Sequence, residues 1–526
     1  MAFHCMNCNG SMIFDVELQQ MRCEHCGSTC LPDEYVFRDT SESADPLSHF
    51  ACQNCGAELE ATEDSMIGIC PYCGGQSMVK AEGKEYSVGQ IIPFKVSKAS
   101  CSEAYASYTK GIRYLPKEFK DASFIQNFTG IYMPYFQYDA KFGDSRLTGS
   151  KTVESNSRYD VVNTYKINAS ITGEYLHGAP FDGSKYLDDE ISARAMPFDT
   201  SQQVPFNPAY LAGFYADTST TSPGLYLEDA EAQAGEEILA LIADEIRAEH
   251  GIPLSSSSTV ETSVTRFRSV LFPLWFLTWR KDDRVAYAVV NGESGKVVSD
   301  LPLDMRSFWV GCGVCSLVLF AVLELLFQPT AALTSFVSLF ASVLMGHAII
   351  VSMRRIYETQ AHVWDKGWTG EETNDGTKSK RKKRREQFSF KDWLPLLPMI
   401  IVGVLYFVIK TNFLLDPTIL FNVRLTPFMA AVPIAVVAYI AHVAKKAWDW
   451  RSYAGGWPAR LAVTSLCVSV VLNAVIAILS PVNDEWYYAG DAVCILALFA
   501  AAIGMIRIFN SSTTRPLPKL FDRQEV

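Results

Sequence analysis

Eight cysteines in the first 73 residues form four Cys-x-x-Cys pairs, the clearest chemical signal in this sequence. The pattern has two halves, and in each half 14 residues separate the first pair from the second. A tetrahedral metal site needs four thiolates at about 2.3 Å from the ion, and two short pairs joined by a small hairpin supply them. The predicted ligands of two structural Zn²⁺ ions are Cys5, Cys8, Cys23 and Cys26 for the first, and Cys52, Cys55, Cys70 and Cys73 for the second.

The residue after the second cysteine of each pair supports this prediction. A chain that wraps around an ion turns sharply there and needs a positive φ, which glycine and asparagine tolerate best. The four places are held by Asn9, Gly27, Gly56 and Gly74. Other side chains that bind metals lie nearby, namely Cys30, His4, His25 and His49. Because two complete sets of four cysteines are present, we interpret these as bystanders.

The start of the chain predicts a reducing, cytosolic environment for these thiols. Residues 1–8 contain no charged segment leading into an apolar one, so no secretory signal is expected. A redox dithiol would instead show a single Cys-x-x-Cys beside a βαβ pattern, which the sequence lacks. Structural zinc is therefore the favoured interpretation.

The elements that must position these sites divide the chain into several predicted parts. They are zinc ribbons at 1–49 and 50–80, a cytosolic domain at 88–303, a transmembrane hairpin at 306–353, a basic cytosolic loop at 354–392, four further transmembrane helices at 393–510 and a cytosolic tail at 511–526. The predicted fold class is multidomain: two small four-cysteine zinc ribbons, an α+β domain with an antiparallel sheet, and an all-α transmembrane region of about six helices.

Mixed periodicity predicts the α+β character of residues 88–303. Helical spacing of apolar residues indicates helices at 98–114 and 225–250. Aromatic and β-branched residues indicate strands at 130–142, 158–176, 268–280, 284–291 and 295–299, with a tight turn at Asn291-Gly292. We expect the helices on one face of the sheet.

A short internal repeat links two of these strands. Residues 131–136, Ile-Tyr-Met-Pro-Tyr-Phe, resemble residues 270–275, Val-Leu-Phe-Pro-Leu-Trp. The repeat predicts two related halves. Since proline cannot donate a hydrogen bond to a neighbouring strand, Pro134 and Pro273 predict an edge strand or a bulge in each half.

Apolar runs of about the ~20 residues that a bilayer requires follow residue 307. The predicted spans are 308–327, 331–353, 393–410, 427–444, 460–480 and 490–509. The loop 354–392 carries eleven Lys and Arg and the loop 445–460 carries four, whereas the alternate loops carry at most two. This asymmetry predicts a multi-pass protein with both the N and the C terminus in the cytosol.

Polar residues inside the predicted spans are few. Glu324, His347 and Asn473 are the candidates, and the first two are expected at different depths. We interpret Asn473 as an interhelical hydrogen-bond partner. The basic run 378–385, from Lys378 to Arg385, lies just before a predicted span, where anionic lipids are its expected partners.

No enzyme motif is recognisable. His177 and His250 are the near-neutral bases of the central domain, and neither lies in a nucleophile or metal motif. Four acidic residues lie close together in sequence: Asp182, Asp188, Asp189 and Glu190. They lack the ligand spacing of a calcium loop, so we interpret them as a solvated acidic turn. No catalytic residue and no organic cofactor is predicted.

Charge makes nucleic acid an improbable partner for the ribbons. Residues 1–50 contain two basic side chains against eight acidic ones, and residues 51–80 contain one against four. Phosphate binding depends on Lys and Arg, so these segments would repel a nucleic-acid backbone. A cytosolic protein with a basic surface is the expected partner.

Five segments of the chain resemble a known family. They are Ile-Ile-Pro-Phe-Lys at 91–95, Pro-Tyr-Phe-Gln-Tyr-Asp at 134–139, Asp-Gly-Ser at 182–184, Val-Pro-Phe-Asn-Pro-Ala-Tyr-Leu-Ala-Gly-Phe at 204–214 and Asn-Gly-Glu-Ser-Gly-Lys at 291–296. With the cysteines, they resemble bacterial membrane proteins with an N-terminal zinc ribbon of the general transcription factor B type. The resemblance covers residues 1–310 and leaves the later spans outside it.

This resemblance implies a protein of the bacterial inner membrane that works with phage-shock-type or flotillin-like proteins in a membrane-stress response. We therefore predict a non-enzymatic, membrane-anchored zinc-ribbon scaffold that recruits cytosolic proteins. Two alternatives stay open. One is a transporter or channel subunit with a regulatory zinc-ribbon domain, and the other is a membrane-tethered nucleic-acid-binding protein.

Overall fold

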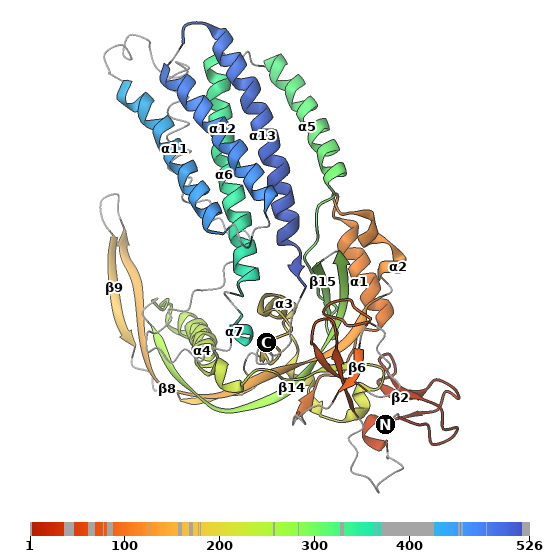
Figure 1. Ribbon diagram of the computed structural model, residues 1–526. Coiled ribbons are helices and arrows are strands. Elements are labelled where there is room, and N and C mark those ends of the chain that lie inside the picture. Colours follow the sequence, from red (N-terminus) through yellow and green to blue (C-terminus); the bar gives the residue numbers. More distant parts are fainter. Residues whose placement is uncertain are drawn as a thin grey trace.

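The computed structural model describes residues 3–35, 47–61, 69–81, 88–369 and 426–517, apart from short gaps. These gaps are 77, 126, 156–159, 168–171, 177, 179, 256–257, 282, 327–330, 363–364, 451–452, 454–455 and 480. Figure 1 shows a sheet-rich part that includes both N-terminal cysteine segments, and a bundle of long helices on one side of it. The basic run 378–385 and the predicted span 393–410 lie outside the described residues.

The two cysteine segments fold as small hairpins. Ribbon 1, residues 3–35, contains β1 (Met12–Asp15), β2 (Gln20–Cys23), β3 (Thr29–Cys30) and the 3₁₀ helix η1 (Pro32–Glu34). Ribbon 2, residues 48–81, contains β4 (Ser48–Cys52), β5 (Glu58–Ala61) and β6 (Met78–Ala81). The strands of ribbon 1 form a separate sheet, whereas those of ribbon 2 belong to the large central sheet.

Within the described residues, that central sheet has 14 strands. Besides ribbon 2 it contains β7 (Gln90–Ile91), β8 (Thr129–Ser155), β9 (Asp160–Ile167), β10 (Gly173–Tyr175), β11 (Pro180–Asp182), β12 (Val204–Pro205), β13 (Tyr215–Asp217), β14 (Thr259–Lys281), β15 (Arg284–Asn291), β16 (Val297–Ser299) and β17 (Arg515–Pro516). Most pairings are antiparallel, as predicted. The short pairs β13–β8 and β14–β7 are parallel, so the sheet is mixed.

The internal repeat lies at the centre of this sheet. β8 and β14 pair with each other, and Met133 faces Phe272, the residue at the same place in the other copy of the repeat. The prediction that Pro134 and Pro273 mark an edge strand or a bulge is wrong, because both lie in these central strands and the register shifts of the β8–β14 pair lie elsewhere. Their carbonyl groups accept matching hydrogen bonds from the backbone N–H groups of Gly183 and Gly292, at 2.7 and 2.8 Å.

Helices cover the central strands on both faces, which corrects the expected one-sided arrangement. They include α1 (Lys98–Lys110), α2 (Ala122–Ile125), α3 (Asp189–Ala195) and α4 (Leu227–His250), with 3₁₀ turns η2 (Lys117–Lys120), η3 (Thr200–Gln202), η4 (Pro208–Leu211) and η5 (Pro223–Tyr226). Tyr132 of β8 packs in a core with Tyr105 of α1, whereas the adjacent Ile131 packs in another core with Ile191 of α3. Since neighbouring residues of a strand point to opposite faces, α1 and α3 lie on opposite sides.

The remaining described helices form the bundle. They are α5 (Met305–Leu326), α6 (Ala331–Gln360), the short α7 (Lys366–Thr369), α11 (Thr426–Asp449), α12 (Trp457–Leu479) and α13 (Asp484–Ser512). α6, α11, α12 and α13 share a core that includes Ile349, Ile440 and Leu466. α5 stands to one side of them (Figure 1), with Val310 and Leu317 exposed.

Two helices in the described residues are long and apolar enough to cross a membrane, Trp457–Ile476 and Asp484–Ser512. Of the about six predicted spans, two therefore coincide with described helices that could cross a membrane. The described apolar part of α5, Met305–Leu319, falls short of the ~20 residues a bilayer needs. Charged side chains interrupt the ends of the other two long helices: Arg354, Arg355 and Glu358 in α6, and Lys445, Lys446 and Asp449 in α11.

The end of α13 returns to the sheet. Residues after α13 form β17, which pairs with β15, and the backbone N–H of Leu517 donates to Asp283 at 2.9 Å. The side chain of Leu517 packs against the core of ribbon 2. Asp300, which follows β16, lies 3.3 Å from Arg355 of α6 and 3.7 Å from Arg515 of β17. Both helix ends are thus tied to the sheet by charge and by backbone pairing.

Candidate metal centres

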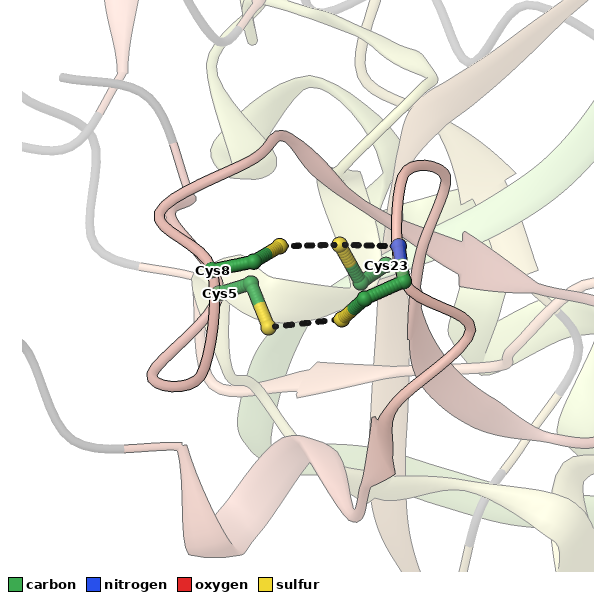
Figure 2. Close-up of side chains that lie close together, drawn as sticks. Cys5, Cys8 and Cys23 are labelled. Carbon is green, nitrogen blue, oxygen red and sulfur yellow. Dashed lines mark hydrogen bonds between the residues drawn. The ribbon is translucent and has the colours of Figure 1, made fainter.

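Among the described residues, two groups of side chains could hold a metal ion, and they are the eight predicted cysteines. In ribbon 1 the Sγ atoms of Cys5 and Cys26 lie 3.5 Å apart, as do those of Cys8 and Cys23. Figure 2 shows Cys5, Cys8 and Cys23 turned toward a common point between the two knuckles. The second group consists of Cys52, Cys55, Cys70 and Cys73, with Sγ separations of 3.6 Å for Cys52 and Cys73 and 3.8 Å for Cys55 and Cys70.

These separations fit thiolates around one ion. Four sulfur atoms at about 2.3 Å from a central ion stand about 3.8 Å apart along the edges of a tetrahedron. A disulfide would bring two of them to about 2.05 Å, and none of the eight cysteines is in a disulfide. The geometry therefore matches a tetrahedral site in each ribbon.

The backbone of all four knuckles is the same, as the sequence predicted. Asn9, Gly27, Gly56 and Gly74 have φ values of 59°, 73°, 81° and 67°. Each donates its N–H to the carbonyl oxygen of the first cysteine of its pair, at distances of 2.7 to 3.0 Å. This turn directs both cysteine side chains of a pair to the same side.

Hydrogen bonds to sulfur favour the thiolate form of two cysteines in ribbon 1, Cys5 and Cys26. In ribbon 1 the backbone N–H of Asn7 donates to Cys5 at 3.4 Å, and the Ser28 hydroxyl lies 3.1 Å from the Cys26 sulfur. The N–H of Asn7 lowers the pKa of Cys5, and the hydroxyl of Ser28 lowers the pKa of Cys26 to about 6. A thiolate is the species that binds a metal, so these contacts prepare the site for one.

Ribbon 1 docks on the sheet domain through β1 and the turn that follows it. The backbone N–H of Phe14 donates to Ala212 at 2.9 Å, and the Phe14 ring meets Tyr210 edge to face at 5.1 Å. Gln19 donates to the carbonyl oxygen of Phe94 at 2.7 Å. Within the metal site, Cys8 and Cys26 are exposed to solvent while the other two cysteines are buried.

Ribbon 2 is instead built into the sheet. All four of its cysteines are buried, and β5 pairs with β13. Tyr72, between Cys70 and Cys73, is buried and donates its hydroxyl to Asp217 at 2.6 Å. Asp217 also accepts a hydrogen bond from Ser184. Burial raises the pKa of Asp217 to about 7, although these two hydrogen bonds oppose the shift.

The other candidates from the sequence lie outside the metal groups. Neither group includes any of the four nearby side chains predicted to be bystanders, Cys30, His4, His25 and His49. His177 lies outside the described residues, as does the side chain of His250. The interpretation of a solvated acidic turn is wrong for Asp182, which is buried. No local pattern indicated that Asp182 would be buried.

In the helix bundle, the prediction for Asn473 is confirmed, since its amide on α12 lies 3.0 Å from the Cys494 sulfur on α13. His347 of α6 lies 3.1 Å from the Tyr439 hydroxyl of α11, and the side chain of Glu324 lies outside the described residues. Sequence reasoning missed Asp491, a buried acid of α13 that accepts a hydrogen bond from Thr334. Its position inside an apolar run was the available signal.

Comparison with known proteins finds a similar protein named "Uncharacterized protein YdjG" from Bacillus subtilis (strain 168). It is 24% identical over 311 residues, which cover 58% of this chain and 90% of that protein. No family model and no solved structure matches the chain. The likeness is distant, and the name of the relative assigns no activity.

Proposed function

We propose that this protein is a non-enzymatic scaffold of the bacterial inner membrane that presents a zinc ribbon to cytosolic protein partners. The observation that carries the proposal is the position of ribbon 1. Its metal site is half exposed, and its strand β1 is fixed to a sheet domain that is bonded to the ends of the long helices. A partner bound at ribbon 1 would thus be held at a fixed place near the membrane.

Zinc is the proposed ion in both ribbons. Four thiolates without histidine or carboxylate suit a soft or borderline ion, and tetrahedral sulfur geometry is typical of structural zinc. The only ionisation that the proposed zinc sites require is loss of the proton from each cysteine thiol that binds the ion. We assign no catalytic residue and no organic cofactor.

A cytosolic location of both termini is part of the proposal. In Figure 1 the N-terminal ribbons and the end of α13 lie on the same side of the helix bundle, which supports this location. Arg507 of α13 lies over the ring of Trp457 at 4.2 Å, a pairing common at membrane interfaces. The basic run 378–385 agrees with a cytosolic loop that contacts anionic lipids, and we propose a multi-pass topology.

The proposed partner is a protein with a basic surface. Ribbon 1 exposes three large apolar side chains, Met6, Leu18 and Leu31, amid an excess of acidic residues. Apolar side chains within a charged rim are typical of protein interfaces. Flotillin-like or phage-shock-type proteins are the partners that the family resemblance suggests. Nucleic acid would be repelled by the same charge.

In-cell crosslinking followed by mass spectrometry of co-purifying proteins tests this proposal. The Cys8→Ser/Cys26→Ser variant loses the metal site of ribbon 1 and should lose the partner while its amount in the membrane fraction stays unchanged. Cys30→Ser is the matched control, because Cys30 lies in the same ribbon outside the metal group. A partner list that is the same in all three proteins would refute recruitment by ribbon 1.

A second candidate function, a transporter or channel subunit, is favoured by polar contacts inside the bundle. Ser338 of α6 lies 3.4 Å from Asp491, and Ser342 of α6 lies 2.9 Å from Ser469 of α12. Ser338 and Ser342 lie on one side of α6, four residues apart, whereas His347 contacts Tyr439 of α11 from another side. Polar side chains inside a membrane bundle often serve ion pathways, although they also join helices.

Ion flux in vesicles containing the purified full-length protein tests this second function. Flux that falls at least tenfold in Asp491→Asn but not in Asp484→Asn would support it. Asp484 is the matched control because it lies exposed at the start of the same helix. Vesicles with wild-type protein that conduct no more than empty ones would exclude it.

A further inference from the structure

A two-stranded arm projects from one end of the central sheet toward the helix bundle (Figure 1). It consists of residues 147–155 of β8 and 160–167 of β9, which pair antiparallel. At its base, the backbone N–H of Ser150 donates to the carbonyl oxygen of Pro253 at 3.1 Å, and Ile167 packs against a core that includes residues of α4. Two segments outside the arm thus hold its base in place.

Beyond its base, the arm exposes apolar side chains on both faces. Val161 and Val162 are neighbours on β9, so they point to opposite faces, and they are 38% and 52% exposed. Tyr165 is also 38% exposed. Among the described residues β9 pairs only with β8, so its outer edge has no strand partner there. Because a two-stranded hairpin with both faces in water is marginally stable, this pattern indicates that another surface covers the arm.

The arm is basic in an otherwise acidic chain. Residues 146–167, which include the arm, contain four Lys and Arg against two Asp and Glu, whereas the net charge of the whole chain is −11. Lys151 and Lys166 are the charged side chains of the arm that the structure describes, and both are exposed. Basic side chains are attracted to anionic lipids, and tyrosine is enriched at the level of lipid headgroups. The composition of the arm therefore suits an anionic bilayer surface.

The end of the helix bundle nearest the sheet has the side chains of a membrane interface. Lys446 of α11 lies over the ring of Trp450 at 5.7 Å, and Arg507 of α13 lies over the ring of Trp457 at 4.2 Å. Trp448, near the end of α11, is 67% exposed. Tryptophan and basic side chains are typical of the boundary between a bilayer and the cytosol. Figure 1 shows the far ends of β8 and β9 at the level of this end of α11, so the arm reaches the same boundary.

We propose that the arm of β8 and β9 binds the cytosolic surface of an anionic bilayer. It enters the headgroup region tip first, with Val161 and Val162 on its two faces, while Lys151 beside them pairs with lipid phosphates. Lys166, closer to the base, adds attraction at longer range. The inference rests on the proposed membrane location of the helix bundle. It gives the sheet domain its own contact with the bilayer, which fixes the tilt of the sheet and so the position of ribbon 1 relative to the membrane.

Photocrosslinking of the purified full-length protein in lipid vesicles tests this contact. The vesicles contain equal parts of phosphatidylglycerol and phosphatidylcholine, or phosphatidylcholine alone. In Val162→benzoylphenylalanine, illumination should attach lipid to the chain in the anionic vesicles, with at least about threefold less adduct in the neutral ones. Adding Lys151→Glu to this protein should lower the adduct in anionic vesicles by at least about threefold. Lys80→Glu, which changes an exposed lysine of ribbon 2, is the matched control and should leave the adduct unchanged.

Two further probe positions separate this inference from the membrane location itself. Leu496→benzoylphenylalanine places the probe on α13, a helix that could cross a membrane, where the Leu496 side chain is 71% exposed. This probe should attach to lipid in both kinds of vesicle. Leu18→benzoylphenylalanine, at an exposed residue of ribbon 1, should attach to none. Lipid on the α13 probe but not on the arm probe would overturn the arm contact alone, and lipid on neither would overturn the membrane location as well.

A second copy of this chain is the competing partner of the arm, because the outer edge of β9 could pair with the same edge of another molecule. The probe at Val162 would then join two chains, which a denaturing gel shows as a dimer in both kinds of vesicle. Such a dimer without lipid adduct would overturn the proposal. An equal yield of lipid adduct with and without phosphatidylglycerol would also overturn it, since the proposed surface is an anionic one.

Discussion

The two ribbons share one cysteine spacing and one backbone turn, yet they have different relations to the rest of the molecule. The knuckle Cys5-Met-Asn-Cys8 exposes Met6, whereas the knuckle Cys70-Pro-Tyr-Cys73 buries Tyr72 against the central sheet. The carbonyl oxygen of Tyr72 also accepts a hydrogen bond from Tyr287 at 2.5 Å. Cysteine spacing sets the metal geometry, and the residues between the cysteines decide whether the site faces solvent or the core.

This difference separates two uses of the same metal site. In ribbon 2 the ion would hold together a hairpin that supplies three strands to the central sheet and contacts the C-terminal Leu517. In ribbon 1, whose strands form a sheet of their own, it would shape a half-exposed surface. We therefore expect recruitment to depend on ribbon 1 and stability to depend mainly on ribbon 2.

The largest expected effect is the loss of the ribbon 2 site. Cys70→Ser/Cys73→Ser should lower the free energy of unfolding of the sheet domain by roughly several kcal/mol. This is a large part of the stability of a domain, and the loss is expected because metal binding and folding are coupled there. Cys8→Ser/Cys26→Ser should leave the thermal midpoint of that domain nearly unchanged. Thermal unfolding of both variants in detergent measures the contrast. Equal losses in the two variants would show that the ribbons are not distinct.

Metal release should differ between the ribbons by at least about tenfold in rate. Cys8 and Cys26 are exposed and accessible to a chelator, whereas ribbon 2 must open before its four buried cysteines can be reached. With zinc loaded in both, a colorimetric chelator should remove one equivalent quickly and the second slowly. Cys8→Ser/Cys26→Ser should remove the fast phase alone. Release of both equivalents in a single phase would contradict the assigned burial.

A smaller effect is expected from one tyrosine hydroxyl in each ribbon. Tyr72→Phe removes a buried donor to Asp217 and should cost about 1–3 kcal/mol. Tyr35→Phe removes a hydroxyl that exchanges exposed hydrogen bonds with the backbone of His4, at 2.9 and 3.1 Å, and should cost less than about 1 kcal/mol. Denaturant unfolding of the two variants compares them. A larger loss in Tyr35→Phe would reverse the assignment of ribbon 2 as the structural one.

Local patterns in the sequence predicted the local structure well. The eight cysteines, the four positive-φ residues and the Asn291-Gly292 turn depend on neighbours within a few residues, and all are as predicted. α1 and α4 begin and end within a few residues of their predicted bounds for the same reason. In each case the deciding physical constraint lies within the segment itself.

Long-range pairings could not be predicted from the sequence. The repeat containing Pro134 and Pro273 indicated two halves, but the pairing of the halves with each other depends on strands 139 residues apart, and each proline is accommodated by a partner from a different segment. The burial of Tyr72 and Asp182 likewise depends on chain that folds back from distant positions. Apolar runs predicted helices in the C-terminal part, while their polar contacts, such as that of Asp491, need the packed bundle.

The last comparison separates the ribbons through pH. The pKa of Asp217, which holds Tyr72 of ribbon 2, is raised by burial from 3.8 to about 7 in the folded chain. The folded state therefore binds more protons than the unfolded state between these values, so Asp217 contributes stability at low pH that is lost as pH rises toward 7. The loss has a slope of at most about 1.4 kcal/mol per pH unit. The Asp217→Asn side chain cannot ionise, so this variant should lack that pH-dependent loss of stability.

Comparison of wild type with Asp217→Asn from pH 5.5 to 8 isolates this effect. Acid also displaces zinc from thiolates, which lowers stability in the opposite direction, but that contribution is common to both proteins. The stability of wild type relative to the variant should fall as pH rises and become constant above about 8. Ribbon 1 has no such buried acid among its described contacts, so the release of its zinc should show the same pH profile in both proteins. A stability difference that does not change with pH would mean that Asp217 stays ionised, and that Tyr72 is held by a charged rather than a neutral acceptor.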